Sequence, residues 1–176
     1  MHWFILIVLG GVLYLIAYQD YKYRAVAVYV YILLFSAVIA YGLTESAWQV
    51  VFWNSLINSA LVLTMTSVLY FLYFLKEKRV NGFFNTKLGM GDLLFWVAVT
   101  PLFSPLNYLL WLIFSMIISL VIYLVGRLIQ PSKKELNKIP LAGIQAIVLL
   151  VIIFLNAVFF HKNLSQDVVS LTELIL

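Results

Sequence analysis

Apolar stretches long enough to cross a lipid bilayer recur along this chain, and they constrain its fold more than any other feature. A membrane-spanning helix needs about 20 predominantly apolar residues. Of the 176 residues, 65% are hydrophobic and only 10% are charged, whereas soluble domains carry roughly 25% charged residues. A soluble domain of this length would still expose about a third of its surface to water. We therefore expect an all-α, polytopic integral membrane protein.

The positions of the apolar stretches predict a bundle of six transmembrane helices. The stretch at 93–126 is too long for one crossing, and Pro101 and Pro105 divide it into two helices. The first stretch lacks a basic segment before it and a small-residue cleavage site after it, so we expect a retained helix rather than a signal peptide. Residues 1–176 are expected to form one domain with a tail at 161–176. The expected helices are 3–19, 25–42, 50–75, 91–103, 106–128 and 139–160.

The distribution of basic residues predicts the orientation in the membrane. Cytoplasmic loops of membrane proteins carry an excess of Lys and Arg. In the six-helix arrangement, ten of the 11 Lys and Arg residues lie on one side, and only Lys162 lies on the other. We expect the basic side to face the cytoplasm of a cell membrane and the N-terminus to lie outside. The tail at 161–176 mixes acidic and apolar residues, which is typical of a short amphipathic helix on the membrane surface.

Two acidic residues on the basic side of the membrane need an explanation. Asp20 lies where the first expected helix ends, and Asp92 lies at the start of the fourth. Residues 93–103 rise only about 16 Å as a helix, against a hydrocarbon core of about 30 Å, so Asp92 is expected below the membrane surface. An ionisable residue at that depth indicates function. The structural alternatives are an ion pair of Asp20 with Lys22 or Arg24, and a helix N-cap role for Asp92.

Two carboxyl groups held close together can hydrolyse a peptide bond. Their like charges make the pair hold a single proton. The ionised carboxylate can take a proton from the attacking water, while the protonated one donates to the developing oxyanion. This chemistry requires that the start of the fourth helix lies beside the end of the first.

These residues resemble the signature of the prepilin peptidases (type IV leader peptidases), which are GxGD-type intramembrane aspartyl proteases. The resemblance rests on Asp20 with Tyr-Lys-Tyr-Arg after it, on Gly89-Met90-Gly91-Asp92, and on the Ile-Pro that opens the last helix. It implies that Asp20 and Asp92 are the catalytic pair. It also implies prepilin-like substrate proteins, which have a short basic leader and a hydrophobic N-terminal helix and are cleaved at the cytoplasmic membrane face.

The motif glycines also have a physical interpretation. Gly89 and Gly91 lack a Cβ atom, so the backbone around Met90 can depart from helix and let another chain approach. Exposed backbone there could pair with an extended substrate; the alternative is a simple flexible turn. The residues expected to support the site are Lys22, Arg24, Lys87 and Pro140.

The chain departs from the family pattern in several places. Residues 25–27, Ala-Val-Ala, stand where an Ile-Pro-Asn-like segment is often found, and Leu93-Leu94 follow the GxGD motif where a Lys is often found. The larger family members carry a cytoplasmic insert with paired cysteines and an N-methyltransferase activity. This chain has no Cys, so we expect a compact peptidase without methyltransferase activity. We expect no metal, no cofactor and no nucleic-acid partner. Besides its substrate, the expected partner of the chain is membrane lipid.

Two other functions remain open at this point. The chain could be a transporter or channel subunit in which the two acids bind a proton or cation, or a catalytically inactive assembly scaffold that keeps the fold. A solute pathway would place polar residues on several helices, whereas the polar residues within spans gather on the third helix. Among them, Asn58 and Ser59 are expected to join helices together.

Overall fold

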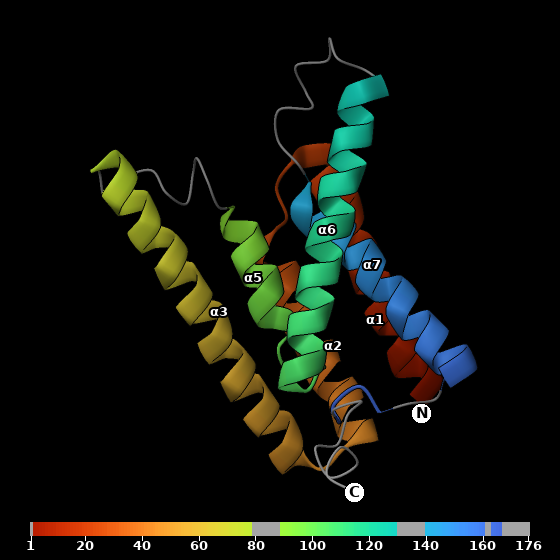
Figure 1. Cartoon of the computed structure of the whole chain (residues 1–176). Coiled ribbons are helices and arrows are strands. Elements are labelled where there is room, and N and C mark those ends of the chain that lie inside the picture. Colours follow the sequence, from red (N-terminus) through yellow and green to blue (C-terminus); the bar gives the residue numbers. More distant parts are fainter. Residues whose placement is uncertain (1, 79–88, 130–139, 161–162, 167–176) are drawn as a thin grey trace, which may run out of the picture.

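The computed structural model describes residues 2–78, 89–129, 140–160 and 163–166. These ranges are helical apart from short connections, and five helices are long and apolar enough to cross a membrane. The fold is a bundle of membrane-spanning helices, as the sequence predicts (Figure 1). Most of the expected tail helix lies outside the described residues. The helices are α1 (His2–Tyr23), α2 (Val28–Glu45), α3 (Trp48–Glu77), α5 (Met90–Val99), α6 (Pro105–Ile129) and α7 (Leu141–Leu155), followed by a π-helical turn, η2 (Asn156–Phe160).

The first helix is longer than expected. It continues past residue 19 to Tyr23, so Asp20 lies within the last turns of α1 rather than directly after it. None of the intervening residues is a helix breaker, and the chain turns only at Arg24, which adopts a left-handed φ of 55°. Asp20 is therefore held on a rigid helix and not on a loop.

The second and fourth helices also differ from their expected ranges. The second begins three residues later than expected, at Val28, because Ala27 is extended and its N–H donates to the Gln19 side chain (3.1 Å). The fourth ends at Val99, four residues before its expected end. Pro101 has no N–H to continue the helical hydrogen bonds, so a turn follows. The remaining expected helices lie close to the observed ones.

α5 is the short helix of the bundle. Its 10 residues rise about 15 Å, which is half the thickness of a hydrocarbon core. The turn after α5 is buried in the protein, so its backbone carbonyls need partners outside the helix. The Asn58 side chain on α3 donates to the carbonyls of Thr100 (2.9 Å) and Phe103 (2.8 Å), and the Ser59 hydroxyl donates to the Thr100 hydroxyl (3.5 Å). The prediction that Asn58 and Ser59 join helices is confirmed.

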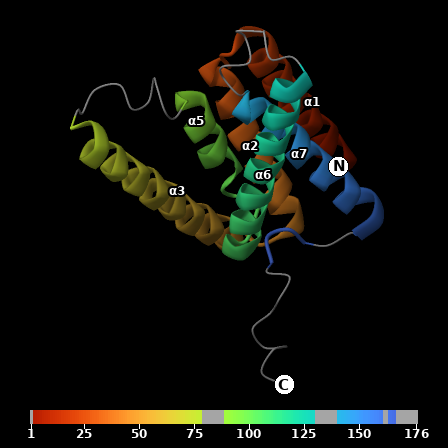
Figure 2. The same cartoon turned by 45° about the horizontal axis from the view of Figure 1, so that its top comes forward.

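Successive helices run in opposite directions, so the termini of different helices lie together at the same end of the bundle. The N-terminal ends of α2, α5 and α7 lie there with the C-terminal ends of α1, α3 and α6 (Figure 1). α1 packs against α7 and α2, and α5 packs against α2. α3 packs against the bundle only through its N-terminal part. Thr66 is its last buried residue, and its C-terminal half lies apart from the other helices in both views (Figures 1 and 2).

Candidate functional site

The N-terminus of α7 brings the two acids together. Pro140 is the N-cap of α7 and makes no side-chain hydrogen bond to the helix. The first N–H groups of a helix have no partner within it, and here other helices supply the acceptors. The N–H of Gly143 donates to Oδ2 of Asp20 (2.6 Å), and the N–H of Ala142 donates to Oδ1 of Asp92 (3.0 Å). Carboxyl groups from α1 and α5 therefore meet at adjacent backbone positions of α7.

The separation of the two acids is limited by this arrangement. Three covalent bonds join adjacent backbone nitrogens, so the oxygens that these nitrogens bind can be no more than about 10 Å apart. The charge of Asp20 also acts on Asp92. Both side chains are half-buried, so each keeps part of its surface accessible. The positive end of the α7 dipole stabilises negative charge at this point.

Gly143 allows α1 to approach α7 closely at the site. A Cβ atom at this position would lie 3.1 Å from Oδ2 of Asp20, 3.2 Å from its Cβ and 3.4 Å from the Ala17 carbonyl oxygen. Ordinary contacts between heavy atoms lie at about 3.5–4.0 Å, so glycine provides the needed room. Sequence reasoning missed Gly143, and the available signal was a glycine in the first turn of an apolar helix that begins after Pro140.

The GxGD segment folds around the Asp92 carboxylate. Gly89 is the extended N-cap of α5, so Asp92 is not the N-cap itself but the third helical residue. The Asp92 carboxylate accepts a hydrogen bond from the Gly89 backbone, in the manner of a capping box. A Cβ atom on Gly89 would lie 2.7 Å from Oδ2 of Asp92. Gly91 lies inside α5, so the expected departure from helix is limited to Gly89, and Met90 is exposed.

The four supporting residues occupy different places. Pro140 lies at the site as the N-cap of α7. The charge of Arg24 acts on Asp20, and the Arg24 N–H donates to the Asp20 carbonyl (3.1 Å). Lys22 is exposed and donates to the hydroxyl of Tyr18, one turn earlier (2.8 Å). Lys87 lies outside the described residues.

A buried polar chain supports the site from within the bundle. The Gln145 side chain accepts from Nε1 of Trp96 (2.8 Å) and donates to the Ser115 hydroxyl (3.2 Å). These bonds join α7 to α5 and α6 a short distance from Gly143. Sequence reasoning missed Gln145, although a lone amide within an apolar span is a signal for interhelical hydrogen bonding.

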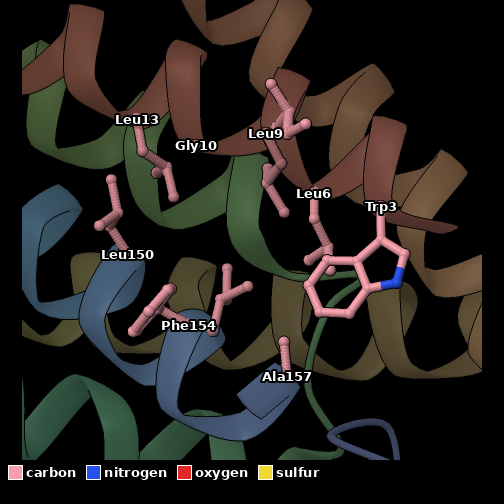
Figure 3. A pocket seen from close by; sticks show the side chains of 10 residues that line it. Trp3, Leu6, Leu9, Gly10, Leu13, Leu150, Phe154 and Ala157 are labelled. Atoms are coloured by element: carbon pink, nitrogen blue, oxygen red, sulfur yellow. The ribbon is translucent and has the colours of Figure 1, made fainter.

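An apolar cavity of about 280 Å³ lies between α1 and α7, away from the acids (Figure 3). Its lining includes Leu13 and Leu150, each about two turns from Asp20 or Gly143. Aliphatic and aromatic side chains line it, so it offers no group for acid–base chemistry. Among the described residues, no cluster of three or more His, Cys, Asp or Glu could hold a metal ion. The candidate site is therefore the acid pair.

No protein-family model, curated protein or solved structure matches this chain. The resemblance to the prepilin peptidases rests on the motif residues and not on similarity over the whole chain.

Proposed function

We propose that this chain is an intramembrane aspartic endopeptidase that removes the short leader from prepilin-like proteins at the cytoplasmic membrane face. The observation that carries the proposal is the convergence of Asp20 and Asp92 on adjacent N–H groups of α7. Two neighbouring carboxyl groups that share one proton supply both the base and the acid for peptide hydrolysis. The N-terminus of α7 favours the single negative charge of such a pair.

The proposed reaction consumes one water molecule and needs no other reactant. The water oxygen adds to the scissile carbonyl carbon while the ionised carboxylate takes one of its protons. The protonated carboxyl gives its proton to the carbonyl oxygen, which forms a neutral diol. The C–N bond then breaks as the nitrogen takes the proton held by one carboxyl group, and a diol hydroxyl returns its proton to the other carboxylate. The acid pair again holds one proton, and the products are a new carboxyl terminus and a new amino terminus.

The proposed substrate class follows from the resemblance and agrees with the exposure of the site. A substrate with a hydrophobic helix can lie in the bilayer beside the bundle while its basic leader stays in the cytoplasm. Gly89 and Met90 are both exposed at the N-terminus of α5. The backbone of an extended substrate can approach there, because glycine leaves the backbone uncovered.

A purely structural role for the two acids as helix caps is the alternative to test. Asn accepts hydrogen bonds at helix N-termini about as well as Asp, but it cannot take up and release a proton. Asp20→Asn and Asp92→Asn therefore retain the capping bonds and remove the acid–base chemistry. The two roles predict different outcomes for the same variants.

The test is co-expression with a substrate that has a basic leader, a Gly at the cleavage position and a hydrophobic helix. Each Asn variant should lose at least about 100-fold in cleavage rate while its thermal unfolding stays close to that of the wild type. Glu77→Gln is the matched control, because it removes a carboxylate from an exposed position at the same end of the bundle. It should cleave normally.

Other outcomes would support other functions. Normal cleavage by both Asn variants would remove the acids from the mechanism and leave a peptidase of another kind or a transporter. A wild type that cleaves no such substrate would favour the inactive scaffold. The transporter gains no support from Asn58 and Ser59, because both side chains are engaged with the turn after α5.

A further inference from the structure

Tyr31 on α2 carries a buried hydroxyl group for which the described residues offer no partner. The side chain is only 4% exposed, and its hydroxyl makes no hydrogen bond within the described part of the chain. Leaving a buried donor unpaired is unfavourable, and each such group in a folded protein calls for an explanation. The position of this hydroxyl provides one.

The hydroxyl of Tyr31 lies against the GxGD segment. A Cβ atom on Gly91 would come within 2.8 Å of the hydroxyl oxygen, so glycine at this position is what leaves room for it. The carboxyl groups of both Asp20 and Asp92 lie near enough to Tyr31 to interact with it electrostatically. α2 therefore brings a third polar group to the place where α1 and α5 bring the acids.

The carboxylate oxygens near Tyr31 already accept other hydrogen bonds. Asp92 accepts from the backbone of Ala142 and Gly89, and Asp20 accepts from that of Gly143. These bonds hold the carboxyl groups in place without using the tyrosine. The hydroxyl is thus not required to build the site, which suits a donor that acts on the substrate.

We propose that Tyr31 is an oxyanion-binding residue, whose hydroxyl donates a hydrogen bond to the oxygen of the scissile carbonyl as water attacks. This inference rests on the proposed peptidase function and deepens it. An extended peptide presents bare carbonyl oxygens, and negative charge develops on one of them in the transition state. A preformed donor in a site of low water content stabilises that charge strongly.

The test compares Tyr31→Phe with Tyr41→Phe. The first substitution removes only the unpaired hydroxyl. Tyr41 is a matched control because it lies on the same helix, is 2% exposed, and has a hydroxyl that bonds to the Asn156 side chain. The measurements are kcat and KM for leader cleavage by the purified variants, together with thermal unfolding.

Tyr31→Phe should lower kcat by about 100-fold, as loss of one oxyanion donor does, with little change in KM. Its unfolding temperature should equal or exceed that of the wild type, because an unpaired polar group is removed. Tyr41→Phe should do the reverse, with a lower unfolding temperature and an unchanged kcat.

Two results would overturn the inference while the proposed function stands. One is a wild-type kcat in Tyr31→Phe. The other is a lower kcat in Tyr31→Phe together with an unfolding temperature below that of the wild type. If the wild type cleaves no substrate, the proposed function and this inference fail together.

Discussion

The contact between Gly143 and Asp20 can be tested by the addition of a single methyl group. In Gly143→Ala, the new Cβ would lie 3.1 Å from Oδ2 and 3.2 Å from Cβ of Asp20. Contacts of this length require the neighbour to move by a few tenths of an ångström. That movement would lengthen the hydrogen bond from the Gly143 N–H, which is 2.6 Å in the wild type.

The expected effects on stability and on catalysis have different sizes. Ala favours helix over Gly by about 0.5–1 kcal/mol, while overpacking by a methylene costs about 1–3 kcal/mol. The net loss of stability should therefore lie between about zero and 2.5 kcal/mol. A misplacement of 1 Å at a catalytic group can cost about 100-fold in rate, so a shift of a few tenths should cost roughly fivefold to tenfold.

The assay is leader cleavage under single-turnover conditions, with thermal unfolding measured on the same samples. Gly10→Ala is the matched control. Gly10 lies on α1, the helix that carries Asp20, and a Cβ atom added there would meet nothing within 4 Å. It should cleave at the wild-type rate. A Gly143→Ala variant that cleaves as fast as the wild type would refute the idea that the α1–α7 contact sets the position of Asp20. An equal loss of rate in Gly10→Ala would show that the effect is not local.

Three further predictions concern the surroundings of the site. Gly89→Ala should reduce cleavage more than Gly143→Ala, because its Cβ would lie only 2.7 Å from Oδ2 of Asp92; equal rates in the two variants would contradict this. Asn58→Leu should destabilise the fold by about 1–3 kcal/mol, since two buried carbonyls lose their donor, and chemical unfolding should show this while kcat stays unchanged. Cleavage should survive EDTA, because no third acid, His or Cys joins the acid pair among the described residues; inhibition that a divalent ion reverses would speak against the proposed mechanism.

The helical framework could be predicted from the sequence because lipid permits few solutions. A long apolar segment in a bilayer must satisfy its backbone internally, so it forms a helix, and Pro101 has only a local effect on where α5 ends. The placement of Asp20 and Asp92 at the same end of the bundle follows from the alternation of these helices. The extension of α1 to Tyr23 was missed, because residues 20–23 are polar or amphipathic and hydropathy alone ends the span before them.

The interior of the site could not be predicted in the same way. The groups that orient the acids are the backbone N–H groups of Ala142 and Gly143, and every residue except proline carries such a group. Tyr31 is one of 11 tyrosines in the chain, and nothing in its local sequence separates it from the others. Its significance depends on the packing of α2 against α5, which is a long-range property.

The N-terminus of α7 limits the distance between the two carboxyl groups of the acid pair. Because the two bonded N–H groups belong to adjacent residues, the spacing of the two acceptor oxygens is tied to one step of the backbone. Asp92 is held from two sides, by α7 and by Gly89, whereas the bond from Gly143 is the one that ties the Asp20 carboxylate to α7. A displacement of α7 against α1 would therefore lengthen the bond that ties the Asp20 carboxylate to α7, whereas Asp92 would keep its bond from Gly89. The buried bonds of Gln145 to Trp96 and Ser115 hold α7 against α5 and α6, so the placement of the two N–H groups depends on a polar contact deep in the bundle as well as on the acids themselves.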